Sequence, residues 1–352
     1  MGIFKDILSG NESLFVDEIA LDFDYIPHAV PYREDIQSYI ASCIKPLMEK
    51  RNGRNVFIHG RPGIGKTVII KHLFNELKQE TSDVEAIYIN CWKTETAFKI
   101  CHEICEQLNY KFVHNKRTDE LLKIIANILN KKSVVFCFDE VDKLIDVQIL
   151  YSLLEDLYRK SIVLICNDRN WLVELDDRIK SRLSVGDIEV KPYNFNETYG
   201  ILKNRMEYAF VKNVFDQDAF DIIAEKTAEL EDIRTGLFLL REAGNIAEAK
   251  ASRKVYLEFA KDAILKVKGL KTKKVESLDD EAKVLLDFIK ENSGKSLKEL
   301  YDNYGKEMSY RTFHRRIKEL KDAKMINTEE KIAGDKGGIT TIVRYDKKLS
   351  DF

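Results

Sequence analysis

The sequence predicts a parallel α/β domain, then an all-helical domain, then a C-terminal domain with the layout of a winged helix. Short apolar runs alternate with helical patterns up to Pro192, and only helical periodicity follows until about residue 266. Three short helical patterns and two strand-like runs come last. The expected divisions are an N-terminal extension (1–30), a core (31–192), a helical domain (193–268), a linker (269–276) and a winged helix (277–352).

In the first domain, each short apolar run is followed by a longer amphipathic segment. Strands that alternate with helices in this way form a parallel sheet covered on both faces. Pro31 favours the first turn of a helix that leads into residues 37–48. The other helices are expected at 66–79, 96–108, 119–129 and 147–158, and the strands at 56–59, 85–89, 133–138 and 162–166.

The rest of the chain is predicted from helical spacing and from one glycine-rich turn. The second domain should contain helices at 197–210, 219–227, 236–250 and 255–266. The tract that follows is rich in lysine and poor in apolar residues, which indicates a linker. The last domain should contain helices at 281–290, 297–304 and 310–321 and a hairpin of strands 326–332 and 340–345.

Composition restricts the class of function. The 352-residue chain is 44% hydrophobic and 33% charged with a net charge of −2, so any basic surface must be local. No apolar run reaches the roughly 18 residues of a membrane span, and we expect no membrane contact. Cys137 and Cys166 lie in apolar runs, which predicts buried thiols in a reducing cytoplasm. Cys101-His102-x-x-Cys105 lacks the second ligand pair of a zinc site.

A complete phosphate-binding motif lies between the first strand and its helix. The sequence after His59 matches G-x-x-x-x-G-K-T in full, and the flanking strand and helix are the context that the motif requires. Backbone N–H groups of such a loop surround a β-phosphate, the lysine reaches the β- and γ-phosphates, and the threonine hydroxyl coordinates Mg²⁺. We therefore predict ATP or ADP with Mg²⁺ as ligands. The expected nucleotide contacts are Gly60, Arg61, Pro62, Gly63, Ile64, Gly65, Lys66, Thr67 and Val68.

Polar residues end the next two central strands. Asp139 and Glu140 follow a hydrophobic run, and after a phosphate-binding loop this pattern predicts a Mg²⁺-holding aspartate and a glutamate that activates water. Asn167 ends the following strand and could orient the same water. Its alternative role is that of an N-cap for the next helix.

Three arginines could complete the site. Arg178 and Arg182 are four residues apart on one helix face and could reach the γ-phosphate of a neighbouring subunit, or form a solvated basic face. Arg234 opens a helix of the second domain and could contact the nucleotide from there, or form a surface salt bridge. We predict Glu140, Asn167, Arg178 and Arg182 as the catalytic set and Asp139 and Arg234 as further nucleotide-binding residues.

The last domain concentrates positive charge on one predicted helix. Ser309 is a suitable N-cap, and Phe313, Ile317 and Leu320 form a buried stripe at helical spacing. The opposite side could enter a major groove, while the glycine turn could reach phosphates. The alternative is a winged helix that binds proteins. The predicted DNA contacts are Arg311, Thr312, Arg315, Arg316, Lys336 and Arg344.

Taken together, these motifs resemble the archaeal Orc1/Cdc6 replication initiators. The resemblance covers about residues 20–346 and includes Tyr25–Glu34, Asn90-Cys91, Phe138–Leu144, Leu175–Leu183, Asp232–Glu248 and Gly334–Gly338, in family order. It implies an AAA+ ATPase with a helical lid and a winged helix. In that family pattern Asp139 and Glu140 are Walker B, Asn167 is sensor 1, Arg234 is sensor 2, and Arg178 and Arg182 are finger candidates. We add Arg33 to the expected nucleotide contacts.

The resemblance also implies partners. These are origin-like double-stranded DNA, the replicative helicase, other initiator subunits, and further copies of the chain on DNA, with slow ATP hydrolysis and a location at the nucleoid. The chain departs from the family at Arg61-Pro-Gly-Ile64 and after Cys91, where the usual Arg-Tyr-Arg-like core is missing. Two alternatives stay open: a STAND-like signalling or defence ATPase, and a transposition-type ATPase whose winged helix binds protein partners.

Overall fold

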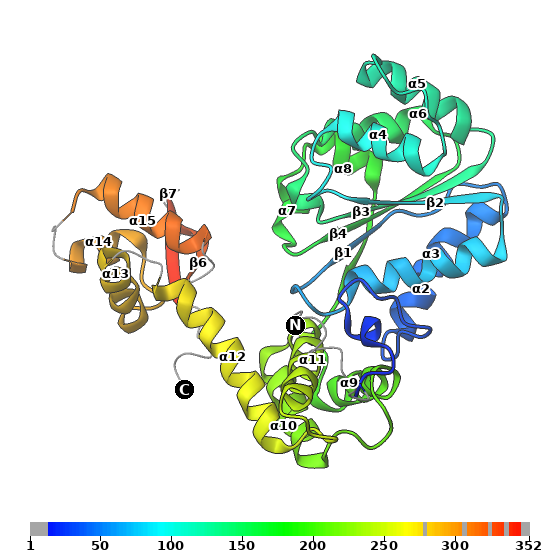
Figure 1. Cartoon of the computed structure of the whole chain (residues 1–352). Helices are drawn as coiled ribbons and strands as arrows, with labels where there is room; N and C mark the ends of the chain where they lie inside the picture. Colours follow the sequence, from blue (N-terminus) through cyan, green and yellow to red (C-terminus); the bar gives the residue numbers. More distant parts are fainter. Residues whose placement is uncertain (1–12, 277–279, 305–307, 323–325, 334–337, 346–352) are drawn as a thin grey trace. The chain divides into compact units, whose positions relative to one another are not determined.

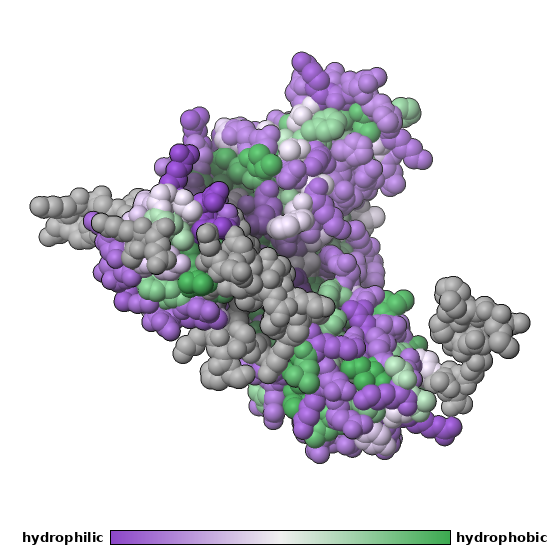
Figure 2. All heavy atoms as spheres, turned by 60° about the vertical axis from the view of Figure 1, so that its left-hand side comes forward, coloured by the Kyte–Doolittle hydropathy of each residue, from purple (hydrophilic) through white to green (hydrophobic). Residues whose placement is uncertain are grey.

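The fold was analysed in a computed structural model that describes residues 13–276, 280–304, 308–322, 326–333 and 338–345. The chain divides into two compact units, residues 1–261 and 262–352, and each is described by itself. In the described residues no helix is long and apolar enough to cross a membrane. In the view of Figure 2, hydrophilic side chains cover most of the described surface and hydrophobic ones are scattered in small groups.

The first unit is built on a five-stranded parallel sheet with the strand order β2-β3-β4-β1-β5. The four predicted strands are present as β1 (Val56–His59), β2 (Val84–Asn90), β3 (Ser133–Asp139) and β4 (Lys160–Cys166). The fifth, β5 (Gly186–Glu189), was not predicted. It is an edge strand with alternating exposure and a single aliphatic side chain, so it lacks the continuous apolar run of a central strand.

Helices cover both faces of this sheet (Figure 1). α2 (Glu34–Met48) and α3 (Lys66–Glu80) lie on one face, and α4 (Ala97–Gln107), α5 (Thr118–Leu129), α6 (Gln148–Asp156) and α8 (Asp177–Leu183) lie on the other. Alternate residues of β3 serve the two layers, since Phe136 and Phe138 join one buried cluster while Val135 and Cys137 join the other. The strands are therefore packed between two buried clusters, one on each face of the sheet, which fixes the positions of the strand ends.

The start of the first α-helix and two short helices differ from the prediction. The first helix begins at Glu34 and not near Pro31, because Tyr32 adopts a left-handed backbone (φ 65°) that cannot continue a helix. Short helices η2 (Val141–Lys143) and α7 (Asn170–Glu174) follow β3 and β4. The predicted burial of Cys137 and Cys166 is confirmed, as both thiols are fully buried.

The helical part of the first unit contains α9 (Phe195–Ala209), α10 (Gln217–Leu230) and α11 (Ile233–Ala249). The described end of the predicted N-terminal extension, with η1 (Glu18–Leu21), packs on these helices. The Val16 N–H donates to the Ala209 carbonyl at 2.8 Å, and the rings of Phe15 and Phe210 lie 4.5 Å apart. This segment is therefore part of the helical layer.

The predicted linker 269–276 has a regular backbone conformation. Its backbone is helical, because α12 runs without a break over Leu257–Glu276. Lysine and leucine have high helix propensity, and the tract contains one glycine and no proline. Its role as a linker between domains stays a prediction.

The second unit contains α13 (Asp280–Glu291), α14 (Leu297–Tyr304) and α15 (Tyr310–Asp322), followed by the antiparallel strands β6 (Ile326–Ala333) and β7 (Gly338–Tyr345). The predicted stripe of α15 is confirmed, with Phe313, Ile317 and Leu320 buried against the other elements. The glycine turn with Lys336 lies outside the described residues.

Candidate functional site

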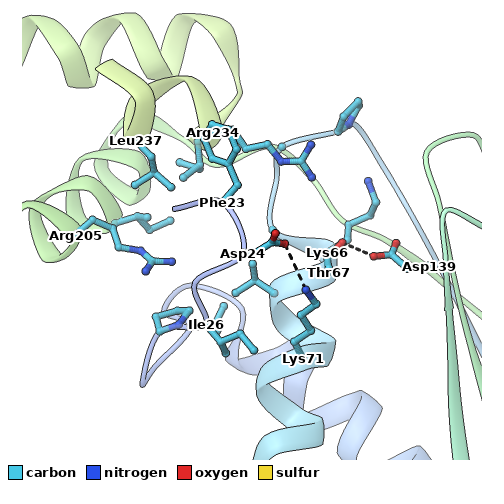
Figure 3. Close-up of a pocket in the computed structure, with 18 of the residues that line it drawn as sticks. Phe23, Asp24, Ile26, Lys66, Thr67, Lys71, Asp139, Arg205, Arg234 and Leu237 are labelled. Carbon is cyan, nitrogen blue, oxygen red and sulfur yellow. Dashed lines mark hydrogen bonds and ion pairs between the residues drawn. The ribbon is translucent and has the colours of Figure 1, made fainter. Parts of the chain in front are cut away.

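A cavity of about 460 Å³ opens where the phosphate-binding loop, the ends of β3 and β4 and the helical layer meet in the first unit (Figure 3). In a parallel sheet all strands end at the same edge, and the register pairs Asn90 of β2 with Asp139 of β3. Loops from neighbouring strands therefore converge there. The predicted residues that line the cavity are Pro62, Gly63, Gly65, Lys66, Thr67, Val68, Asp139, Glu140, Asn167 and Arg234.

The glycines of the loop are required by its geometry. Gly63 has φ 81°, and a Cβ there would collide with the Asp232 carboxylate. Gly65 has φ 90°, precedes the first turn of α3, and would bring a Cβ to 3.1 Å from the Tyr193 hydroxyl. Only glycine adopts these angles without strain. The result is an open loop at the N-terminus of α3, a geometry that suits a phosphate.

Lys66 is buried beneath this loop. Its Nζ donates to the carbonyls of Gly60 at 2.6 Å and Arg61 at 2.7 Å, and to Asn167 Oδ1 at 2.9 Å. Burial lowers the pKa of Lys66 from 10.5 to about 8, although the Asp139 charge opposes that change. The ammonium therefore lies between the loop and the end of β4, where it can exchange carbonyl partners for phosphate oxygens.

Asp139 ends β3 and is 3% exposed. Its Oδ2 accepts hydrogen bonds from the hydroxyls of Thr67 and Tyr88, both at 2.6 Å, and its Oδ1 accepts the Glu140 N–H at 2.9 Å. A hydroxyl and a carboxylate are oxygen ligands of the kind that Mg²⁺ prefers, and phosphates and water complete such a site. The residues present therefore fit Mg²⁺.

Glu140 faces the cavity from an unusual backbone conformation. Its φ is 54°, in the left-handed region, at the sharp turn between β3 and η2. Burial, with the charges of Asp139 and Asp142, raises the pKa of the Glu140 carboxyl above its ordinary value. A carboxylate with a raised pKa is a stronger base, which suits proton abstraction from water.

Four predicted contacts lie outside the cavity lining. Ile64 is buried in the core, and Gly60 serves as an acceptor for Lys66. Arg61 forms an ion pair with Glu231 of the helical layer. Arg33 stacks on Tyr193, with 3.9 Å between the guanidinium carbon and the ring centre, and donates to the Lys191 carbonyl at 2.5 Å. Arg33 therefore supports a lining residue from behind.

The two finger candidates lie on α8, away from the cavity of their own chain. Arg178 is 88% exposed at its side chain, and its nearest acid is Asp176 at 3.8 Å. Arg182 pairs with Glu155 of α6 at 2.6 Å. A role for either in this chain's own site has no geometric support, and a role toward a neighbouring copy stays a prediction.

The apolar end of the cavity was missed. The segment 23–31 and helix α9 supply it, with Arg205 held over the Tyr25 ring at 4.7 Å and donating to the Ala20 carbonyl at 3.3 Å. No periodicity marks such a segment, and only its prolines and aromatic residues hinted at an ordered path. The lining residues from these two regions are Phe23, Asp24, Ile26, Pro27, His28, Ala29, Val30, Pro31, Ile201, Asn204, Arg205 and Tyr208.

In the second unit, α15 presents part of the predicted basic set. Arg311, Arg315 and, on β7, Arg344 are exposed. Ser309 caps the helix as predicted, accepting the Thr312 N–H at 3.2 Å. Arg316 differs from the expectation of a free side chain, because it is only 17% exposed and pairs with Glu319 at 2.9 Å. Its position next to the buried stripe explains the difference.

Comparison with known proteins places these features in a family. A sequence model of an AAA domain matches residues 49–168, and one of the Cdc6 AAA+ ATPase-type lid domain matches residues 199–264. The ORC1-type DNA replication protein 1 of Sulfurisphaera tokodaii is 32% identical over 280 residues, which are 75% of this chain and 70% of that protein. The chain belongs to the archaeal Orc1/Cdc6 family. As a member of it, the chain is an AAA+ ATPase that binds nucleotide.

Further Orc1/Cdc6 relatives cover nearly the whole chain. The ORC1-type DNA replication protein of Desulfurococcus amylolyticus is 28% identical over 96% of this chain and 92% of its own length. The Aeropyrum pernix ORC1 protein, solved in complex with DNA, has a TM-score of 0.70 at 24% identity, with 96% of this chain and 95% of that chain covered. The Aeropyrum pernix ORC2 protein, solved as ADPNP-ADP complexes, has a TM-score of 0.69 at 20% identity, with 95% and 94% covered. The similarity to these relatives therefore extends beyond the AAA+ core and the lid to nearly the whole length of the chain.

The pKa of Lys66 predicts a pH dependence of nucleotide binding. Below pH 8 the ammonium is already charged, whereas above pH 8 the side chain must take up a proton to pair with phosphates. ADP binding at pH 8 should therefore take up about half a proton, and affinity should fall up to about tenfold per pH unit above that value. Calorimetry in buffers of different ionisation enthalpy measures this uptake.

Lys66→Arg is the matched control, because arginine stays charged and cannot titrate in this range. Equal proton uptake at pH 8 in the wild type and in this variant would assign the proton to another group.

Proposed function

We propose that this Orc1/Cdc6 chain is a replication initiator that binds ATP with Mg²⁺ in the cavity, binds origin-like duplex DNA and helps to recruit or load the replicative helicase. One observation carries the proposal: the cavity unites a phosphate-binding loop, the acids after β3, Asn167 after β4 and Arg234 of the helical layer. Family membership favours replication over the alternative of a signalling or transposition ATPase.

In the proposed reaction each residue has one task. Lys66 transfers its hydrogen bonds from the loop carbonyls to the phosphates, and Arg234 meets the nucleotide from the lid. Thr67 and Asp139 would hold Mg²⁺, and the bound metal would neutralise phosphate charge. Glu140 takes the proton of the attacking water, which Asn167 orients. Because no arginine of α8 lines this cavity, Arg178 or Arg182 of a neighbouring copy would have to complete the site, and hydrolysis by a single chain should be slow.

Nucleotide occupancy could set the position of the lid through direct contacts with the loop. Ile233 donates its N–H to the Gly63 carbonyl at 3.2 Å, and Arg61 pairs with Glu231. Arg234 follows immediately in sequence and lines the cavity. A phosphate that draws Arg234 inward therefore acts on the same turn, between α10 and α11, that binds the loop.

We propose that the second unit binds DNA. In this proposal it is a winged helix, and α15 is its recognition helix. Arg311 and Arg315 are exposed on the side opposite the buried stripe, half-buried Thr312 lies at its flank, and Arg344 on β7 would add a phosphate contact. The DNA complex of the Aeropyrum pernix ORC1 protein supports this proposal. A chain that acts on origin DNA would work at the nucleoid, with other initiator subunits or further copies of itself.

Replacing the proposed base should separate binding from hydrolysis. Glu140→Gln keeps the size of the side chain but removes the carboxylate, so ATP should stay bound while turnover falls about 10²- to 10⁴-fold. Equilibrium binding of ATP and a phosphate-release assay measure the two effects. Unchanged turnover would reject the assignment of Glu140.

Removing exposed arginines of α15 should weaken duplex binding. Arg311→Ala with Arg315→Ala should lower affinity at least tenfold, and the salt slope of log affinity should fall by about 1 for each of the two arginines that contacts a phosphate and not a base. Fluorescence anisotropy with labelled intergenic and random duplexes, with ATP or ADP and at several salt concentrations, measures both quantities.

Lys298→Ala on α14 is the matched control for loss of an exposed positive charge. If the wild type binds duplexes in neither nucleotide state, the proposal of an initiator fails. If it binds and the double variant binds equally well, the DNA interface lies elsewhere.

A further inference from the structure

Tyr88 is a polar residue of the cavity that the reaction outlined above does not use. It lies on β2, two residues before the strand ends, beside β3 in the sheet. Its hydroxyl donates to Asp139 Oδ2 at 2.6 Å and its side chain lines the cavity. Neither residue of this hydrogen bond is in the phosphate-binding loop.

The hydrogen bond matters because of how Asp139 is held. Oδ2 also accepts the Thr67 hydroxyl at 2.6 Å, while Oδ1 accepts the N–H of the adjacent Glu140. Thr67 is expected to turn its oxygen toward Mg²⁺ when the metal binds. Tyr88 then remains as the side-chain donor from a different strand that fixes the carboxylate.

Tyr88 is itself held by two neighbouring side chains, Gln107 and Lys71. The Gln107 side-chain amide bonds the Tyr88 backbone twice, accepting its N–H at 3.3 Å and donating to its carbonyl at 2.7 Å. Lys71 Nζ lies 5.1 Å from the ring centre and 3.6 Å from the carboxylate of Asp24, as the dashed line to Asp24 in Figure 3 indicates. Burial and the nearby Asp139 charge raise the pKa of the phenol, so it stays a donor.

We propose that Tyr88 is a positioning residue that holds the Asp139 carboxylate in the orientation needed for the divalent metal. The inference rests on the Mg²⁺ site under the proposed function. Groups that hydrogen-bond a metal ligand commonly change metal affinity 10- to 100-fold when removed. Tyr88 contacts the Asp139 carboxylate and not the phosphate-binding loop. Loss of the Tyr88 hydroxyl should therefore weaken metal binding without weakening the phosphate contacts of the loop.

The test compares Tyr88→Phe with the wild type as full chains. ADP affinity is first measured by calorimetry in EDTA, and Mn²⁺ is then titrated into the ADP complex and followed by electron paramagnetic resonance. We expect Mn²⁺ affinity to fall at least tenfold, with metal-free ADP affinity changed less than about twofold. Tyr158→Phe, which removes a hydroxyl from a side chain exposed at the surface, should change neither value.

Two further comparisons separate the inference from its basis. Asp139→Asn removes the carboxylate, and if the wild type binds Mn²⁺ no more tightly than this variant, the proposed metal site fails. If the wild type binds Mn²⁺ more tightly than Asp139→Asn does, and Tyr88→Phe binds Mn²⁺ as tightly as the wild type, the inference on Tyr88 fails. Loss of ADP affinity in EDTA by Tyr88→Phe also overturns it, because Tyr88 would then support the whole cavity.

Discussion

The site depends on the burial of opposite charges at one edge of a parallel sheet. Lys66 is 6% exposed and Asp139 3% exposed, and buried charges are tolerated only when every polar atom finds a partner. The adjacent order of β3, β4 and β1 supplies those partners, since Asn167 directly follows β4 and the loop after β1 turns two carbonyls toward Lys66. The ammonium is thus stabilised without phosphate and is ready to exchange partners when phosphate enters.

The phosphate-binding loop also connects the sheet domain of the first unit to its helical layer. Gly63 accepts a hydrogen bond from Ile233, Arg61 pairs with Glu231, and no side chain larger than hydrogen fits at Gly63 beside Asp232. Gly63 therefore allows the helical layer to contact the loop and also keeps the loop open to a phosphate. A substitution there would disturb both, so its effect on nucleotide binding alone would not reveal which contact was lost.

The sequence predicted those features whose signals are local. The phosphate-binding loop, the acids after β3 and Asn167 each follow an apolar strand within a few residues, and the sheet brings them together as expected. The strand β5 was missed because it has a single aliphatic side chain and no apolar run, and segment 23–31 was missed because it has no periodic pattern; the positions of both depend on contacts with distant residues. Arg33 shows the same limit, because its stacking on Tyr193 joins residues 160 positions apart.

Glu140 illustrates how one turn serves several needs. A left-handed backbone at a non-glycine residue costs about 1–2 kcal/mol, and here it lets the Glu140 N–H donate to Asp139 while the side chain faces the cavity. The nearby Asp139 charge also helps to raise the pKa of the Glu140 carboxyl. Whatever fixes the Asp139 carboxylate, Tyr88 and Thr67 included, therefore also fixes the electrostatic environment of the proposed base. In the proposed reaction, the Asp139 side chain would therefore couple metal binding to proton abstraction by Glu140.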